Sequence, residues 1–196
     1  MAGVTRRFGW LETLAWFGLY AGLIGFVLFA DGSAPMYRQI FIDRTATHWL
    51  PDATRDYEPG TTISGTEPSA FFAGGWWWAT PDGIWGKGER NVVEVVPRRA
   101  VPAGGRVTGT LRALIGGLRQ SQAVSVSVAG VEIGRLQFED GSTKEFSFSL
   151  PMTLPAGERA EIVFHVPGAQ SPLLLHIDGN TRQLGIQLLR LVVGAP

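Results

Sequence analysis

Apolar side chains occupy every second position through much of residues 71–196. The clearest alternating runs are Val124, Val126, Val128; Phe146, Phe148, Leu150; and Ile162, Phe164, Val166. Successive side chains of a strand point to opposite faces of a sheet, so each run places its apolar residues on one face. The pattern predicts further strands at residues 71–79, 91–96, 107–115, 132–138 and 185–193.

Turn signals rich in glycine and proline separate these runs, and the chain contains 26 Gly and 12 Pro. Examples are Pro81-Asp82-Gly83, Asp140-Gly141 and Pro155-Ala156-Gly157. No long helical period follows residue 31. The sequence therefore predicts a mainly β domain over residues 71–196, an antiparallel jelly-roll-like β-sandwich preceded by a single N-terminal transmembrane α-helix.

The N-terminal region contains an uncharged, mostly apolar run from Thr13 to Ala30. As a helix the run is about 27 Å long, close to the thickness of a bilayer core, and residues 8–30 complete the crossing. Arg6 and Arg7 precede it, so the positive-inside rule places residues 1–7 in the cytoplasm of a bacterium and the remainder in the periplasm. A cleaved signal peptide is the alternative. The length of the run and the poor cleavage site at Leu28-Phe29-Ala30 favour an anchor retained in the inner membrane.

One stripe of the predicted helix carries only small residues. Its members are Ala15, Gly18, Gly22 and Gly25. Small residues at this spacing allow two helix backbones to approach closely, which predicts helix packing against another integral membrane protein. The alternative is that glycine is simply frequent in membrane helices.

Residues 31–70 are interpreted as an extracytoplasmic connector. They contain four prolines and several Gly, Ser and Thr residues, which favour irregular structure. A short amphipathic helix at residues 36–49 fits two locations equally well, the membrane interface or a cap on the β domain.

Residues 76–194 resemble a β-sandwich domain found at the extracytoplasmic ends of bacterial membrane glycosyltransferases and exopolysaccharide proteins. The matching motifs are Gly83-Ile84-Trp85-Gly86, the strand at 91–96, the Val-rich strand ending at Ala129-Gly130, Ser171-Pro172, Asp178, and Arg182-Gln183-Leu184-Gly185. Ala129 stands where that pattern usually has Asn, and the spacing from Asp178 to Arg182 is expanded. The resemblance implies a sandwich in a surface-glycan setting and does not imply catalysis.

The chain shows no pattern that predicts catalysis, a cofactor or a metal site. It has no cysteine, no G-x-S-x-G motif, and three histidines without metal-ligand spacing, at 48, 165 and 176. We therefore expect a non-enzymatic protein without a cofactor. Lys+Arg and Asp+Glu both number 17, so no basic field favours nucleic acid.

The tryptophans at 76, 77, 78 and 85 are the best candidates for ligand contact, because indole stacks on the apolar faces of sugar rings. Strand alternation places Trp76 and Trp78 on one side and Trp77 on the other, so Trp76, Trp78 and Trp85 are predicted glycan or partner contacts. The alternative is core packing. Asp178 and Arg182 are further candidates, with a loop-bracing ion pair as their alternative.

Two functions follow from these observations. The first is a single-pass membrane subunit that helps to assemble or stabilise a larger inner-membrane complex, with membrane lipid and other integral membrane proteins as partners. The alternative is a membrane-tethered, glycan-binding accessory module of polysaccharide synthesis or export, with polysaccharide as partner. The sequence does not choose among a glycan synthase, a transporter and an energy-transducing assembly as the larger complex.

Overall fold

The computed structural model describes residues 16, 55–67 and 69–194. The chain divides into two compact units, Met1–Ile42 and Asp43–Pro196. Within the described residues, no helix has the length and apolar character needed to cross a membrane. Apart from Trp16, the predicted anchor lies outside the described residues, as do the stripe of Ala15, Gly18, Gly22 and Gly25 and the predicted helix at 36–49.

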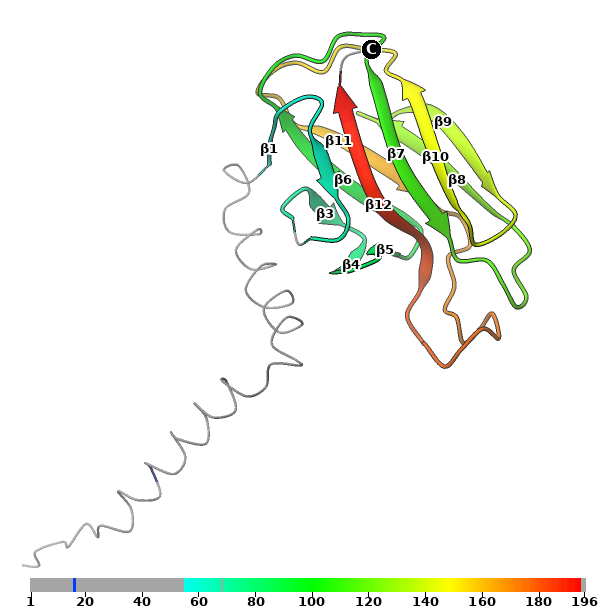
Figure 1. Cartoon of the computed structure of the whole chain (residues 1–196). Coiled ribbons are helices and arrows are strands. Elements are labelled where there is room, and N and C mark those ends of the chain that lie inside the picture. The colour runs from blue at the N-terminus through cyan, green and yellow to red at the C-terminus, as the bar shows by residue number, and fades with distance from the viewer. Residues whose placement is uncertain (1–15, 17–54, 68, 195–196) are drawn as a thin grey trace, which may run out of the picture. The chain divides into compact units, whose positions relative to one another are not determined.

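Twelve strands form two sheets in the described part of the second unit, and the protein is mainly β (Figure 1). The first sheet has the order β1-β6-β11-β8-β9, and β3 also pairs with β6. Its strands are β1 (Asp56–Tyr57), β3 (Phe72–Gly74), β6 (Arg90–Pro97), β8 (Gln122–Val128), β9 (Val131–Phe138) and β11 (Ala160–His165). All its pairs are antiparallel except the short parallel pair of β1 and β6.

The second sheet has the order β10-β7-β12-β5-β4, and β2 pairs with β12 beyond the end of β5. Its strands are β2 (Thr62–Ser64), β4 (Trp76–Thr80), β5 (Gly83–Lys87), β7 (Arg106–Ala113), β10 (Thr143–Ser149) and β12 (Leu184–Gly194). Every pair in this sheet is antiparallel.

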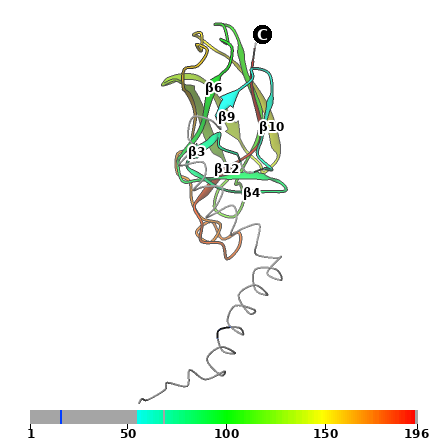
Figure 2. The same ribbon diagram turned by 90° about the vertical axis from the view of Figure 1, so that its left-hand side faces the viewer.

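The two sheets pack face to face as a sandwich, which Figure 2 shows edge-on. Alternate residues of both sheets meet in one apolar core. Phe164 on β11 of the first sheet lies edge-to-face against Phe146 on β10 of the second, with ring centroids 6.2 Å apart. Burial of these alternating apolar residues is the main driving force for association of the sheets.

Most of the expected strands are confirmed within one to three residues at each end, because their alternation matches the burial of their side chains. The expectation of one strand at 71–79 was wrong. Gly75 divides that segment into β3, in the first sheet, and β4, in the second. Its φ of 74° is a left-handed conformation that L side chains rarely adopt, and it allows the chain to cross between the sheets.

Residues 55–64, which the sequence assigned to an irregular connector, contribute β1 to the first sheet and β2 to the second. No strand was predicted at Gly83–Lys87 either, but the structure has β5 there, between β4 and β12. The sandwich therefore begins earlier in the chain than expected.

Candidate functional site

A β-bulge in β4 determines which tryptophans face away from the core. Trp76 pairs with Gly86 and Ala79 pairs with Ile84, so three steps along β4 match two steps along β5. Trp76 and Ala79 are both buried, whereas Trp77 and Trp78 are both half-buried. The extra residue thus turns Trp77 and Trp78 to the same outer side, which strict alternation would not allow.

Trp76 is a core residue, so its prediction as a surface contact was wrong. Its side chain is 3% exposed, and its indole N–H donates to the carbonyl oxygen of Val92 at 2.8 Å. The ring also lies edge-to-face against Phe164, with centroids 6.1 Å apart. Trp76 therefore joins the two sheets and is not available to a ligand at the surface.

Trp85 lies on β5 beside the bulge and points to the same outer side as Trp77 and Trp78. Its neighbours Ile84 and Gly86 face the core, so Trp85 and Lys87 share the outer side. Trp77 and Trp78 are in edge-to-face contact at 5.5 Å. The indole N–H of Trp77 donates to the carbonyl oxygen of Gln183 at 3.2 Å, which fixes its orientation.

Three cations lie over these indoles. The guanidinium carbon of Arg182 is 4.0 Å from the ring centroid of Trp78 and 5.4 Å from that of Trp77. The Lys87 ammonium lies 5.0 Å from the Trp77 centroid, and the Arg112 guanidinium lies 5.5 Å from the Trp85 centroid. No carboxylate among the described residues forms an ion pair with any of the three, and each cation lies over the negative face of an indole ring.

Gln187 on β12 completes a row of side chains across the second sheet. It pairs with Trp85 on one side and with Arg112 of β7 on the other. The Arg112 guanidinium donates to the Gln187 side-chain oxygen, and the Gln187 Nε2 has no hydrogen-bond partner within the described part of the chain. Gln187 is 0% exposed although it lies on the outer side, because its neighbours enclose it. An unpaired buried amide donor is costly, so this enclosed Nε2 is the least satisfied polar group of the row.

We call this set the aromatic face: Trp77, Trp78, Trp85, Lys87, Arg112, Arg182 and Gln187. The structure brings together three predicted residues, Trp78, Trp85 and Arg182, and it adds four that the sequence analysis did not select. Lys87 could have been found from the sequence, because it is two positions from Trp85 and therefore lies on the same side of a strand. Arg112 and Gln187 could not have been found in this way, since only the sheet register brings them to Trp85.

Asp178 does not belong to the aromatic face. Its carboxylate accepts a hydrogen bond from the backbone N–H of Asn180 at 2.7 Å. No ion pair joins Asp178 to Arg182, and the Arg182 guanidinium lies over the rings of Trp77 and Trp78. The interpretation of these two residues as a loop-bracing ion pair was therefore wrong.

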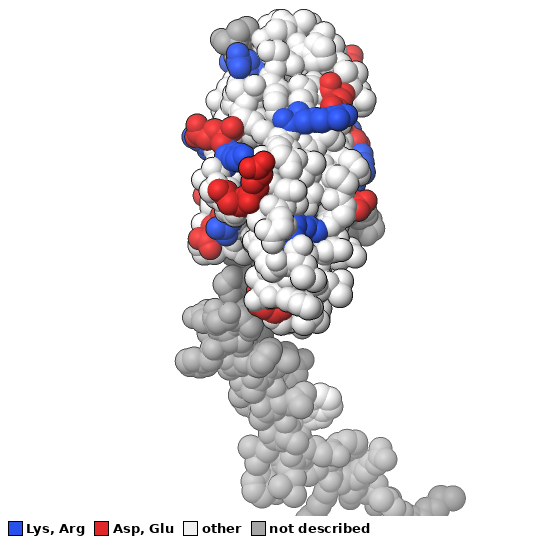
Figure 3. Space-filling view, turned by 90° about the vertical axis from the view of Figure 1, so that its right-hand side faces the viewer, with Lys and Arg blue, Asp and Glu red and all other residues white. Residues whose placement is uncertain are grey.

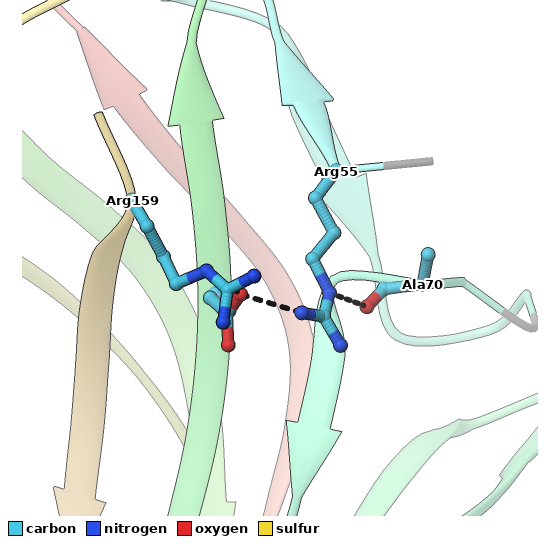
Figure 4. Close-up of polar contacts among 4 residues, drawn as sticks. Arg55, Ala70 and Arg159 are labelled. Atoms are coloured by element: carbon cyan, nitrogen blue, oxygen red, sulfur yellow. Dashed lines mark hydrogen bonds and ion pairs between the residues drawn. The ribbon is translucent and has the colours of Figure 1, made fainter. Parts of the chain in front are cut away.

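A second polar cluster lies on the outer side of the first sheet, where Glu94 and Arg55 are mostly buried and Arg159 is half-exposed (Figure 4). Glu94 on β6 accepts from Arg55 at 2.6 Å and from Arg159 at 2.8 Å. Arg55 also donates to the carbonyl oxygen of Ala70 at 3.3 Å. The cluster ties the segment before β1 and the segment before β3 to β6, and its groups are already satisfied by one another. We interpret it as structural.

Several exposed basic residues outside the aromatic face have acidic partners, as in the pairs Arg98–Asp56, Arg135–Glu132 and Arg190–Glu145. Figure 3 shows one face of the molecule, on which basic and acidic side chains are interspersed and separated by uncharged surface. This matches the net charge of +0. The unpaired cations of the aromatic face are therefore a local feature.

No family model matches the chain, and no curated protein matches it. Among solved structures, 77 chains match. The carbohydrate-binding module CBM36 in complex with calcium and xylotriose is 13% identical, with 68% of this chain and 99% of that chain covered and a TM-score of 0.42.

Two further matches have similar scores. The mosquito-larvicidal Cry4Aa toxin from Bacillus thuringiensis is 6% identical, with 71% of this chain and 25% of that chain covered and a TM-score of 0.42. The CBM36-1 domain of a multidomain xylanase from the hindgut metagenome of Trinervitermes trinervoides is 14% identical, with 69% and 97% covered and a TM-score of 0.39. With TM-scores below 0.5, these likenesses assign no site and no ligand to this chain.

Proposed function

We propose that this protein is a glycan-binding β-sandwich and that the aromatic face is its binding surface. The observation that carries the proposal is the bulge in β4, which turns Trp77 and Trp78 outward beside Trp85. A bulge that re-aims side chains at a sheet edge is typical of binding and active sites.

The chemistry of the aromatic face suits a sugar chain. Indole rings stack on the C–H faces of sugar rings, and guanidinium, ammonium and amide groups donate hydrogen bonds to hydroxyl and carboxylate oxygens. Lys87, Arg112 and Arg182 offer such donors beside the indoles, and Gln187 is enclosed beneath them and accepts from Arg112.

The dimensions of the face favour a chain over a single sugar. The row from β4 through β5 and β12 to β7 spans three strand spacings, or about 14 Å. An oligosaccharide segment laid across the strands would contact Trp78, Trp85 and Arg112 in turn.

The strand order is the basis for a finer assignment of the fold. Setting aside β1 to β4, the sheets run β5-β12-β7-β10 and β6-β11-β8-β9. This is the two-Greek-key arrangement of an eight-stranded jelly roll, and we assign the domain to that type.

We further propose that it binds glycan without transforming it. Anchoring by residues 8–30, a periplasmic location and a part in assembling a membrane complex stay predictions that rest on the sequence.

The test is binding of neutral and acidic polysaccharides to the full chain in detergent, measured by affinity electrophoresis and calorimetry. We expect Trp78→Ala and Trp85→Ala each to weaken binding at least about tenfold, because each removes one stacking platform. Arg106→Ala is the matched control for Arg112→Ala, since both arginines point outward from β7 but only Arg112 lies over an indole.

Thermal unfolding of the same variants separates binding from folding. The three indoles are half-buried, so Trp78→Ala and Trp85→Ala should leave the protein folded. Unchanged affinity in folded tryptophan variants, or no binding by the unmodified chain to any glycan, would overturn the proposal.

A further inference from the structure

Two neighbouring loops carry four large aliphatic side chains into solvent. Leu118 is 68% exposed, Leu173 49%, Leu174 64% and Ile177 40%. Leu118 lies between β7 and β8, and the other three lie between β11 and β12. We call these four residues the apolar tip. In Figures 1 and 2 the segment between β11 and β12 extends beyond the strands, at the end of the sandwich where β4 and β5 lie.

The loops of the apolar tip are held in place by their own backbone. The Leu118 N–H donates to the Leu175 carbonyl at 2.9 Å, which joins the two loops. Leu173 N–H donates to the Asn180 carbonyl and Ile177 N–H to the Pro172 carbonyl, both at 2.9 Å. Leu175 is buried and anchors the longer loop. The exposed leucines are thus presented by an ordered turn.

The groups next to the apolar tip are those that favour a membrane interface. Arg182 follows the loop within a few residues, and its guanidinium lies over Trp77 and Trp78, with Lys87 beside Trp77. Tryptophan, lysine and arginine are enriched at the level of lipid headgroups, and cations there attract anionic lipids. The one acid in the loop, Asp178, is engaged by the Asn180 backbone N–H.

The size and form of the tip favour a bilayer over a protein partner. A stable protein interface buries about 800 Å² on each side and is formed by 20 or more residues, whereas the tip offers four side chains on projecting loops. Such a tip can enter the interfacial region of a bilayer without a shaped partner. We infer that the apolar tip inserts into the interface of a bilayer that contains anionic lipid, with Lys87 and Arg182 at its headgroups.

The absence of cysteine from the sequence permits a direct test. Leu174→Cys, and separately Ala156→Cys in the exposed turn before β11 at the opposite end of the sandwich, would be labelled with a polarity-sensitive fluorophore in the full chain. Each labelled protein is mixed with or reconstituted into vesicles of phosphatidylcholine, with or without phosphatidylglycerol. Some lipids carry a nitroxide quencher.

We expect the label at 174 to shift to shorter wavelength and to be quenched several-fold more than the label at 156, most strongly with phosphatidylglycerol. Lys87→Gln and Arg182→Gln should each reduce this preference for anionic lipid about fivefold. Equal quenching at both positions overturns the inference. A shift that needs no lipid and grows with protein concentration also overturns it, because it shows self-association through the tip.

Discussion

The outer sides of the two sheets differ in what covers them. On the first sheet, Val92 and Glu94 of β6 point away from the core but are buried. Arg55, just before β1, binds the Glu94 carboxylate and also donates to the Ala70 carbonyl just before β3. On the second sheet, Trp77, Trp78 and Trp85 point away from the core and stay half-exposed. We call the covered outer side around Glu94 of β6 the closed face, and the outer side around Trp77, Trp78 and Trp85 the open face.

The charges of the two faces follow the same division. Glu94 on the closed face is shared by two arginines, so that face has no free charge to offer at this point. On the open face, Lys87, Arg112 and Arg182 have no acidic partner among the described residues. What distinguishes the two faces is therefore the pairing of their charged groups as well as their aromatic content.

The difference between the two sheets depends first on the crossing at Gly75, which carries the chain from β3 in the first sheet to β4 in the second. A Cβ at Gly75 would overlap the backbone carbonyl of Arg90, and its φ is 74°. We expect Gly75→Ala to lower the free energy of unfolding by about 4 kcal/mol. Gly157 has the same φ of 74° but open space around it, so Gly157→Ala should cost only about 1 kcal/mol. Urea unfolding followed by tryptophan fluorescence measures both; equal losses would show that the Gly75 crossing is not tightly packed.

The stability of the closed face depends on Glu94. Glu94→Gln removes the carboxylate while Arg55 remains mostly buried, so we expect a loss of about 3 kcal/mol in the free energy of unfolding. The control is Arg90→Ala, which breaks the exposed pair with Glu161 and should cost about 0.5 kcal/mol. Similar losses for the two variants in chemical unfolding would contradict a buried brace.

A third interaction, at Tyr57, holds β1 to the second sheet. The Tyr57 hydroxyl donates to the Thr61 carbonyl at 2.6 Å and accepts from the Val193 backbone N–H at 2.8 Å. Tyr57→Phe leaves that buried N–H without its partner, so we expect a loss of about 2 kcal/mol. Thermal unfolding measures the loss at neutral pH, and a variant as stable as the parent would show that water replaces the hydroxyl.

The same residue predicts an alkaline dependence. Burial raises the pKa of Tyr57 above its ordinary value of 10.0. In the unfolded chain the phenol ionises near pH 10, whereas the folded protein retains the proton. This contribution to stability is therefore complete below pH 10 and is lost as the pH rises from 10 through the folded pKa. Unfolding midpoints across this range should fall less steeply in Tyr57→Phe than in the parent.

Alternation in the sequence was sufficient to predict the long strands of the core. The runs through Val126, Phe146 and Phe164 have one buried and one outer side, and the structure confirms them as β8, β10 and β11. The period of two is imposed by the backbone and needs no knowledge of the partner strand. That is why these strands were predictable from residues alone.

The candidate site was less predictable, because it depends on non-local register. Three consecutive tryptophans show no alternation of apolar and polar residues from which a bulge could be predicted. Trp76 was therefore assigned to the surface and Trp77 to the opposite side. Glu94 sits within an apolar strand, but its partners Arg55 and Arg159 come from 39 and 65 positions away. The positions of such residues depend on which strands pair and on which segments of the chain cover each sheet.

The position of β12 in the second sheet has a consequence for biogenesis. This strand is the last of the twelve in chain order, yet it lies between β7 and β5 and also holds β2. Without it, the pair β7–β10 and the pair β4–β5 have no hydrogen-bonded link to each other. Completion of this sheet must therefore wait until the ribosome has released residues 184–194. Until then the hydrophobic face of the second sheet lacks its central strand, so the sandwich core closes only at the end of synthesis.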